Sequence, residues 1–135
     1  MREKFIIDGA RFDTIEGFFC EVDEVFTKDL TFRTGHNLDA YNDILRGGFG
    51  RHERGEPIAI LWKNAAKSRS DFGYPATAKY CEDKLKRCHP LNRDIVKKQI
   101  IDALNEIGPT LMDEIIEITL YDKRSGHDCT LEFEE

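Results

Sequence analysis

The sequence has no apolar run that approaches the roughly 20 residues needed to span a bilayer, and its mean hydropathy is −0.52. Its first residues, MREKFIIDGARFD, carry charges where a secretory signal peptide needs an apolar stretch. Both absences predict a cytoplasmic protein without membrane contact. A chain of 135 residues can bury one hydrophobic core, so we expect a single domain over residues 1–135.

The sequence also lacks a CxxC pair, although it contains four cysteines. In the cytoplasm these cysteines are expected to remain free thiols, and we expect Cys20 and Cys81 to be small buried side chains. The proximity of Cys81, Cys88 and His89 leaves a zinc site as an alternative, but known zinc ligand pairs are usually spaced more tightly. We therefore expect no metal and no cofactor.

Basic residues are in the minority, with 20 Lys and Arg against 26 Asp and Glu, a net charge of −6. Nucleic-acid binding needs a basic face that neutralises phosphates, so direct binding to nucleic acid is not expected. An acidic protein suits a basic partner, because complementary fields raise the association rate. A charge of this size is common, and it does not identify a function by itself.

The first quarter of the chain predicts a strand followed by a helix. The run Phe5–Gly9 is short, apolar and ended by Asp-Gly, which is typical of a strand and a turn. Apolar residues then recur at spacings of three and four, which predicts a helix over residues 15–27 with Thr14 as its N-cap.

A second helix is expected to begin after Asn37, a good N-cap, and to end at the pair Gly47 and Gly48. The continuous apolar run Pro57–Trp62 follows, and such a run is typical of a strand covered on both faces. We place Trp62 in the core, because it ends this buried strand.

The second half is less regular. Helices are expected over residues 77–88 and from Asn92 to Gly108, followed by a strand over residues 115–120. Residues 129–133 alternate apolar and polar side chains, which indicates a possible antiparallel edge strand. The element order predicts a small α/β layer, with a mostly parallel three-stranded sheet packed by helices.

The segment from Gly35 to Leu45 is the most informative. On the second helix Asp39 and Asp43 lie four residues apart, so both carboxylates stand on one face. Like charges at this spacing repel by a few tenths of a kcal/mol, and a helix that keeps them can be presenting them to a cation. The alternative is a solvated polar face opposite Leu38, Tyr41 and Leu45.

This segment, Gly-His-Asn-Leu-Asp-Ala-Tyr-Asn-Asp-Ile-Leu, resembles the signature of the barstar family. The first strand, the Pro-led strand that ends in Trp62 and the run Ile116–Leu120, taken as the closing strand, resemble the same family. The resemblance is good over residues 4–63, weak over 64–113 and returns at 114–121. It leaves an insertion at about residues 64–93 and a C-terminal extension at about residues 122–135.

The resemblance implies a barstar-like fold and inhibition of a ribonuclease in a one-to-one complex formed by a monomer. Asp43 matches the carboxylate that enters the phosphate pocket of the nuclease, and Asp39 matches a second acidic contact. A carboxylate can replace phosphate because both accept bidentate bonds from arginine. A third acidic contact lies in the last helix of the family, with Asp102 and Glu106 as candidates. The further partner-binding candidates are Arg33, His36, Asn37, Asn42 and Gly47.

Two other classes of function fit parts of the sequence. His36, Asp39 and Asp43 could ligate a metal or share acid–base chemistry, but no second cluster or phosphate loop completes an active site, so we expect no enzyme. Alternatively, the chain is an interaction module or an immunity protein for a different toxin, because a fold does not fix a function. Arg33 and Asn42 favour this alternative, since the family prototype carries aromatic residues there.

Overall fold

The computed structural model describes residues 2–27, 35–121 and 127–135 of the chain. A three-stranded sheet with the order β1-β2-β3 forms the base of the fold, and both strand pairs are parallel. The predicted α/β class with a parallel three-stranded sheet is therefore confirmed. The strands are β1 (Glu3–Asp8), β2 (Ile58–Lys63) and β3 (Cys129–Glu134).

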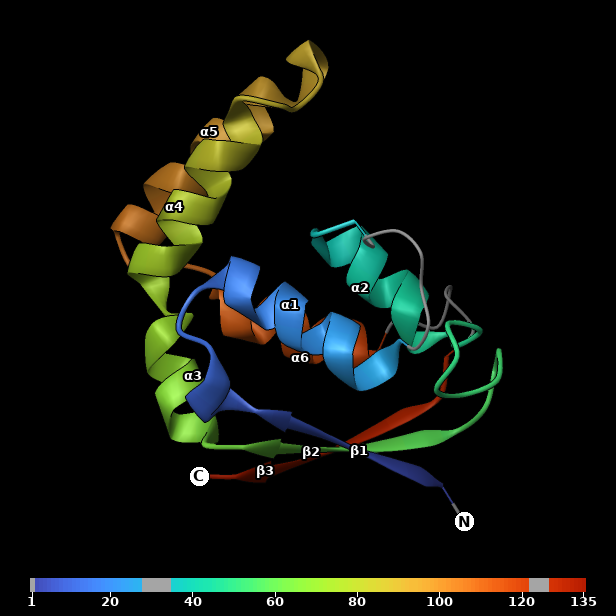
Figure 1. Ribbon diagram of the computed structural model, residues 1–135. Coiled ribbons are helices and arrows are strands. Elements are labelled where there is room, and N and C mark those ends of the chain that lie inside the picture. Colours follow the sequence, from blue (N-terminus) through green and yellow to red (C-terminus); the bar gives the residue numbers. More distant parts are fainter. Residues whose placement is uncertain (1, 28–34, 122–126) are drawn as a thin grey trace.

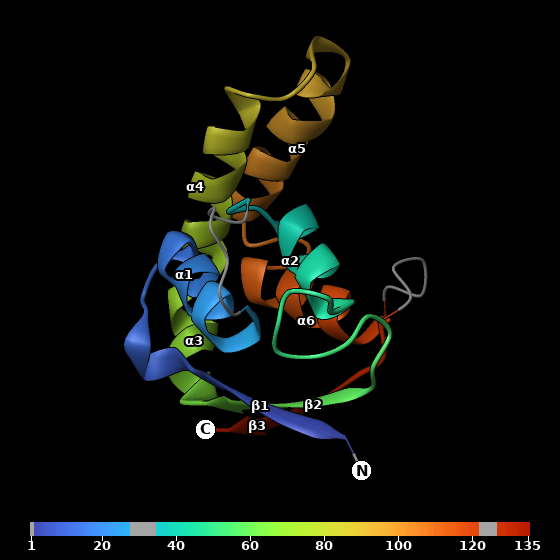
Figure 2. The ribbon, with the colours of Figure 1, turned by 45° about the vertical axis from the view of Figure 1, so that its right-hand side comes forward.

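Six helices are found in the described part of the chain, together with two short 3-10 turns at Gly9–Arg11 and Pro90–Asn92. Helices α1, α2 and α6 lie on one side of the sheet, and α4 and α5 pack together as an arm that projects away from it (Figures 1 and 2). None of the described helices is long and apolar enough to cross a membrane. The helices are α1 (Ile15–Phe26), α2 (Leu38–Leu45), α3 (Ala65–Asp71), α4 (Tyr74–Leu85), α5 (Arg93–Leu104) and α6 (Leu111–Tyr121).

The core lies between the sheet and the helices above it. Trp62 is fully buried, and its ring stacks on Phe18 of α1 with the centroids 5.5 Å apart. The Trp62 indole N–H donates to the Ser68 hydroxyl at 3.0 Å, so its polar atom is satisfied inside the core. The expectation that Trp62 belongs to the core is confirmed.

The expectation that β2 is covered on both faces is wrong. Ile58, Ile60 and Trp62 are buried, whereas the residues between them, Ala59 and Leu61, are only partly buried. The described helices cover one face of the sheet, so the other face is partly open to solvent. Ala59 and Leu61 are apolar although no described helix covers them. They lie in the central strand, where the two neighbouring strands flank them and keep them partly buried.

The strand expected over residues 115–120 is also wrong, because these residues belong to α6. Leu111, Met112, Ile115 and Thr119 are buried and follow a helical spacing that places them on one face. Thr110 begins the helix, since its hydroxyl accepts from the Asp113 N–H at 3.1 Å and the Asp113 carboxylate accepts from the Thr110 N–H at 2.9 Å. The β-branched residues here misled the prediction, because packing outweighs intrinsic propensity.

The strand predicted over residues 129–133 exists, but it is parallel and not antiparallel. It pairs with β2 in a register that places Ile58 opposite Cys129 and Trp62 opposite Phe133. With α6 a helix, the chain crosses back over the sheet before β3 and enters it at the same end as β2. Because residues 115–120 form a helix and not a strand, β3 runs parallel to β2 and not antiparallel to it.

The cysteines are all free thiols in the structure, as expected. Cys81 is buried, whereas Cys20 is exposed on α1, which corrects the expectation that both are buried. Cys20 therefore lies outside the core, and its thiol is accessible from solvent.

Candidate partner-binding face

Helix α2 is built by local signals that the sequence predicted correctly. The Asn37 side chain accepts a hydrogen bond from the Ala40 N–H at 2.8 Å, which caps the helix. The helix ends before Gly47, whose φ of +93° favours glycine. A Cβ at Gly47 would lie 2.3 Å from the carbonyl oxygen of Glu53. Asn37 and the buried Gly47 thus have local structural roles in shaping α2.

One face of α2 is anchored in the core. Tyr41, Ile44 and Leu45 are buried, and the Tyr41 hydroxyl lies 2.6 Å from the Thr119 hydroxyl of α6. Because the Thr119 hydroxyl donates to the Ile115 carbonyl at 2.8 Å, Tyr41 is the donor in this pair. The anchoring fixes which side of α2 faces away from the core.

Asp39 and Asp43 lie on the exposed side of α2. The Asp43 side chain is 59% exposed, and its Oδ1 lies 2.5 Å from Arg46 Nη2. The Arg46 Nε is buried and has no hydrogen-bond partner among the residues that the structure describes. The structure thus gives Asp43 a cationic neighbour within its own helix turn, which the charge pattern of the sequence analysis did not include.

Asn42 and His36 both contact other parts of the protein. Asn42 is partly buried, and its Oδ1 lies 3.0 Å from His127 Nε2, next to the start of β3. His36 Nε2 lies 2.8 Å from Asp23 Oδ2, and its Nδ1 contacts Glu16. The structure therefore connects His36 to α1 and does not bring it together with Asp39 and Asp43 as metal ligands.

The environment of His36 changes its proton affinity. Partial burial alone would lower the pKa of His36, but the hydrogen bonds and charges of Asp23 and Glu16 outweigh it, and the pKa is raised above its usual value. His36 therefore connects the segment just before α2 to Glu16 and Asp23 of α1.

The two candidates for a third acidic contact, Asp102 and Glu106, lie in or beside α5. Asp102 lies on α5 and pairs with Lys98 at 2.9 Å, and Glu106 follows α5, so both belong to the arm region. The last helix is α6, which packs against α2 and carries Glu114 and Glu117. Sequence reasoning missed α6 because it assigned this segment to a strand. Arg33 lies outside the described residues.

Glu114 lies in a polar junction of three helices near the start of α2. Burial raises the pKa of Tyr80 on α4, and the charges of Glu114 and Asp39 add to this rise, whereas Leu38 and Arg87 oppose it. Burial raises the pKa of Glu114; Lys84 partly opposes this rise, whereas Glu117 and Asp113 add to it. Asp39 of α2 and Glu114 of α6 thus both act on Tyr80 of α4, and no local sequence signal connects the three residues.

Together these features define a small α/β protein with a parallel sheet and an acidic face on its second helix. A family model described as Barstar (barnase inhibitor) matches residues 2–89, which is more than half of the chain. The chain belongs to the barstar family. The match includes most of residues 64–93, and no curated protein matches the chain. At the level of the family, the description is of inhibitors of a ribonuclease and not of enzymes.

Proposed function

We propose that this protein inhibits a ribonuclease by inserting Asp43 of α2 into the basic active site, with Asp39 as a second contact. The observation that carries the proposal is the division of α2 into a core-anchored face with Tyr41 and an exposed face with both carboxylates. A helix fixed in this way presents its carboxylates with little loss of conformational freedom on binding.

The pair between Asp43 and Arg46 supports a specific binding step. Arg46 holds the Asp43 carboxylate at 2.5 Å before binding, and arginine or histidine groups of the nuclease would replace or join it. A buried carboxylate is favourable only when cations surround it closely. The pair therefore orients Asp43 at the surface, and the partner supplies the remaining positive charge.

The test is a titration of the protein into RNA cleavage by a barnase-like ribonuclease, with wild type beside Asp43→Asn and Asp43→Ala. We expect stoichiometric inhibition by wild type and a loss of about 2–5 kcal/mol of binding free energy in the variants, the range general to truncated buried charge pairs. Asp83→Asn is a matched control, because Asp83 is also exposed on a helix and pairs with Lys86 three residues on. Equal loss in Asp83→Asn and Asp43→Asn would contradict the role of Asp43.

A second candidate is an immunity protein for a different basic toxin. It is favoured by Asn42, which stands where the family prototype carries an aromatic residue and which contacts His127 within this protein. If wild type leaves the barnase-like enzyme fully active, capture of a partner by wild type but not by Asp43→Asn would support this candidate. Capture by both proteins would argue against any role of the α2 face.

A further inference from the structure

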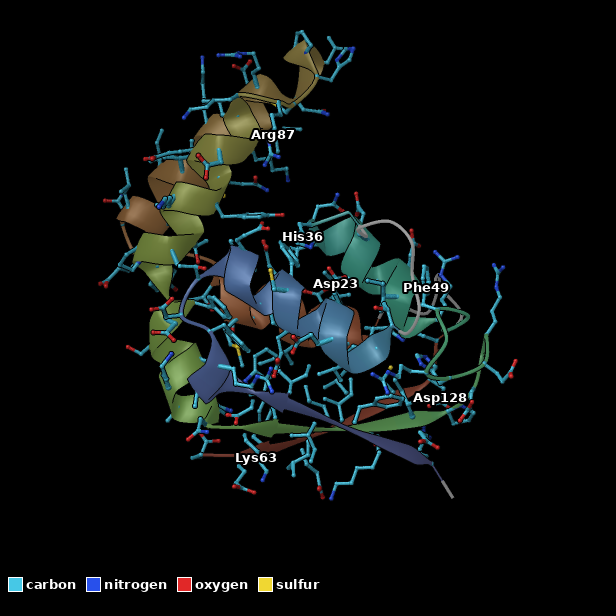
Figure 3. All side chains as sticks on the ribbon, viewed as in Figure 1. Asp23, His36, Phe49, Lys63, Arg87 and Asp128 are labelled. Atoms are coloured by element: carbon cyan, nitrogen blue, oxygen red, sulfur yellow. The ribbon has the colours of Figure 1, made fainter. Side chains whose placement is uncertain are left out.

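One cluster of potential metal ligands lies apart from the two aspartates of α2. Glu16, Cys20 and Asp23 follow each other at spacings of four and three on α1, so they lie along one side of that helix. His36 lies over this side, and Figure 3 labels it with Asp23 between α1 and α2. In the described part of the chain, Glu16, Cys20 and His36 bring one ligand atom each to within 4.8 Å of one another.

We propose that Glu16, Cys20 and His36 form a zinc site that joins α1 to the start of α2. Zinc binds thiolate, imidazole and carboxylate ligands at about 2.0–2.3 Å. A tetrahedral ion with such bonds holds its ligand atoms about 3.5 Å apart, so small side-chain rotations complete the set. A thiolate ligand favours zinc over magnesium or calcium, which prefer oxygen. Three protein ligands leave a fourth position for water.

The second nitrogen of His36 has the partner that a metal-bound imidazole needs. His36 Nδ1 faces Glu16, and Nε2 lies 2.8 Å from Asp23 Oδ2. With zinc on Nδ1, the Nε2–H donates to Asp23, the arrangement in which a carboxylate orients a histidine ligand. Zinc then takes the place of a proton shared between Nδ1 and Glu16. Zinc binding therefore releases that proton and the proton of the Cys20 thiol to solvent, so affinity falls as pH falls.

The position of the cluster allows metal entry and gives the ion a structural effect. Glu16 and Cys20 are exposed, whereas the His36 side chain is only 12% exposed and lies near the Phe19 ring. His36 directly precedes the N-cap of α2. A bound ion therefore fixes the start of α2 against α1, on the side of the molecule that carries Asp39.

The zinc site that the sequence analysis left as an alternative, Cys81, Cys88 and His89, is not assembled among the described residues. Cys88 and His89 lie at the end of the arm, and His89 Nδ1 accepts a hydrogen bond from the Leu91 N–H at 3.1 Å. Cys81, Cys88 and His89 are not brought together as a ligand group in the part of the chain that the structure describes. The pair Cys88 and His89 thus provides a control with the same ligand types.

The experiment is a titration of the chelator-treated, reduced protein with Co²⁺ and then Zn²⁺, followed by optical absorption. We expect a thiolate-to-cobalt charge-transfer band and tetrahedral d–d bands that Zn²⁺ removes. The charge-transfer band should be lost in Cys20→Ser and retained in Cys88→Ser and His89→Gln. Asp23→Asn should keep the band but bind zinc about 10–100-fold more weakly.

Circular dichroism of each variant checks that the fold is intact, and Cys20→Ser is expected to fold because Cys20 is exposed. A wild-type protein without the charge-transfer band, or a band that survives in Cys20→Ser, would overturn the proposal. The measurement contains no nuclease. Failure of the inhibition assay therefore leaves the zinc site standing, and failure of the zinc site leaves inhibition by Asp43 standing.

Discussion

The body of the protein, formed by the sheet with α1, α2, α3 and α6, differs from the arm of α4 and α5 in how it buries apolar surface. The body packs large aromatic rings, such as Phe18, Phe72 and Trp62, which are all fully buried. On the arm helices, Val96 and Ala103 are the buried apolar residues of α5. Five of the seven large hydrophobics that are exposed in the described chain lie in or beside the arm: Leu91, Ile95, Ile101, Leu104 and Ile107.

The two regions also differ in charge. The arm tip, residues 84–98, contains six Lys or Arg residues and one Asp, a net charge of +5. Since the whole chain has a net charge of −6, the rest of the chain carries a net charge of −11. Figure 3 labels Arg87, which follows the end of α4 in the turn that leads toward α5. The overall charge of −6 therefore combines two regions of opposite sign, and the aromatic core lies in only one of them.

The largest effect should come from the aromatic core. Phe18→Ala removes a ring that stacks on Trp62 and contacts Tyr41 and Phe72, so we expect a loss of about 3–5 kcal/mol in the free energy of unfolding. Urea denaturation followed by Trp62 fluorescence measures it. A loss below about 1 kcal/mol would mean that the body does not carry the stability.

The matched change in the arm should cost less. Val96→Ala removes two methyl-sized groups from a buried side chain, which at about 0.8 kcal/mol for each buried carbon predicts a loss of about 1–2 kcal/mol. Hydrogen exchange should locate the loss in α4 and α5, because these helices pack mainly on each other. Exchange that rises equally in α1 and the sheet would show that the arm and the body unfold as one unit.

The opposite charges of the two regions predict an effect on association, if the proposed inhibition holds. The basic arm tip repels a basic ribonuclease, so reversing it with Arg87→Glu and Lys97→Glu should raise the association rate a few-fold at low salt. Stopped-flow mixing measures the rate, and the gain should shrink as salt screens the charges. The neutral variants Arg87→Gln and Lys97→Gln should give an intermediate gain; a slower rate would show that the tip contacts the partner favourably.

The junction between the regions predicts a pH effect. Burial raises the pKa of Glu114 in the folded state, and the positive charge of Lys84 opposes this rise. The negative charges of Glu117 and Asp113 add to the rise. Glu114 also acts on Tyr80 and Cys81 of α4. A raised folded pKa stabilises the protein at low pH and loses that contribution as pH rises through it. Glu114→Gln should therefore raise the melting temperature at pH 7, and the gain should shrink toward pH 4. An equal gain at both values would exclude the ionisation of Glu114 as its cause.

The smallest effect should come from the apolar residues of the arm tip. Leu91 is 83% exposed, so Leu91→Ser should change the free energy of unfolding by no more than about 0.5 kcal/mol. The same urea titration measures it. A larger loss would mean that Leu91 is buried in solution and that the arm tip packs against another surface.

Elements with strong local signals were predictable from the sequence. The caps Thr14 and Asn37 and the apolar spacing after them gave α1 and α2 nearly to the residue. The exposed carboxylates of α2 followed from the same spacing. The run at residues 115–120 failed because a short β-branched run fits a buried helix as well as a strand, and the direction of β3 depended on that choice.

Contacts between segments that are distant in the sequence were not predictable, because such contacts leave no periodic pattern in the sequence. His36 meets Glu16 and Asp23 only after α1 and the segment before α2 come together. Glu114 approaches α2 only because α6 crosses the sheet. Residues of this kind decide the electrostatics of the candidate site, and a single sequence supplies their identities but not their neighbours.

The open face of the sheet has a consequence for aggregation. Parallel sheets usually have both faces covered, and this one keeps Ile6 beside Leu61 on the side away from the described helices. The neighbouring positions there are charged, with Glu132 opposite Leu61 and Lys63 beyond it. An exposed apolar patch on a protein surface favours association between molecules, and charged side chains beside the patch reduce its apolar area. Glu132 and Lys63 make this open face partly charged, so removing both charges should favour association of molecules through the face.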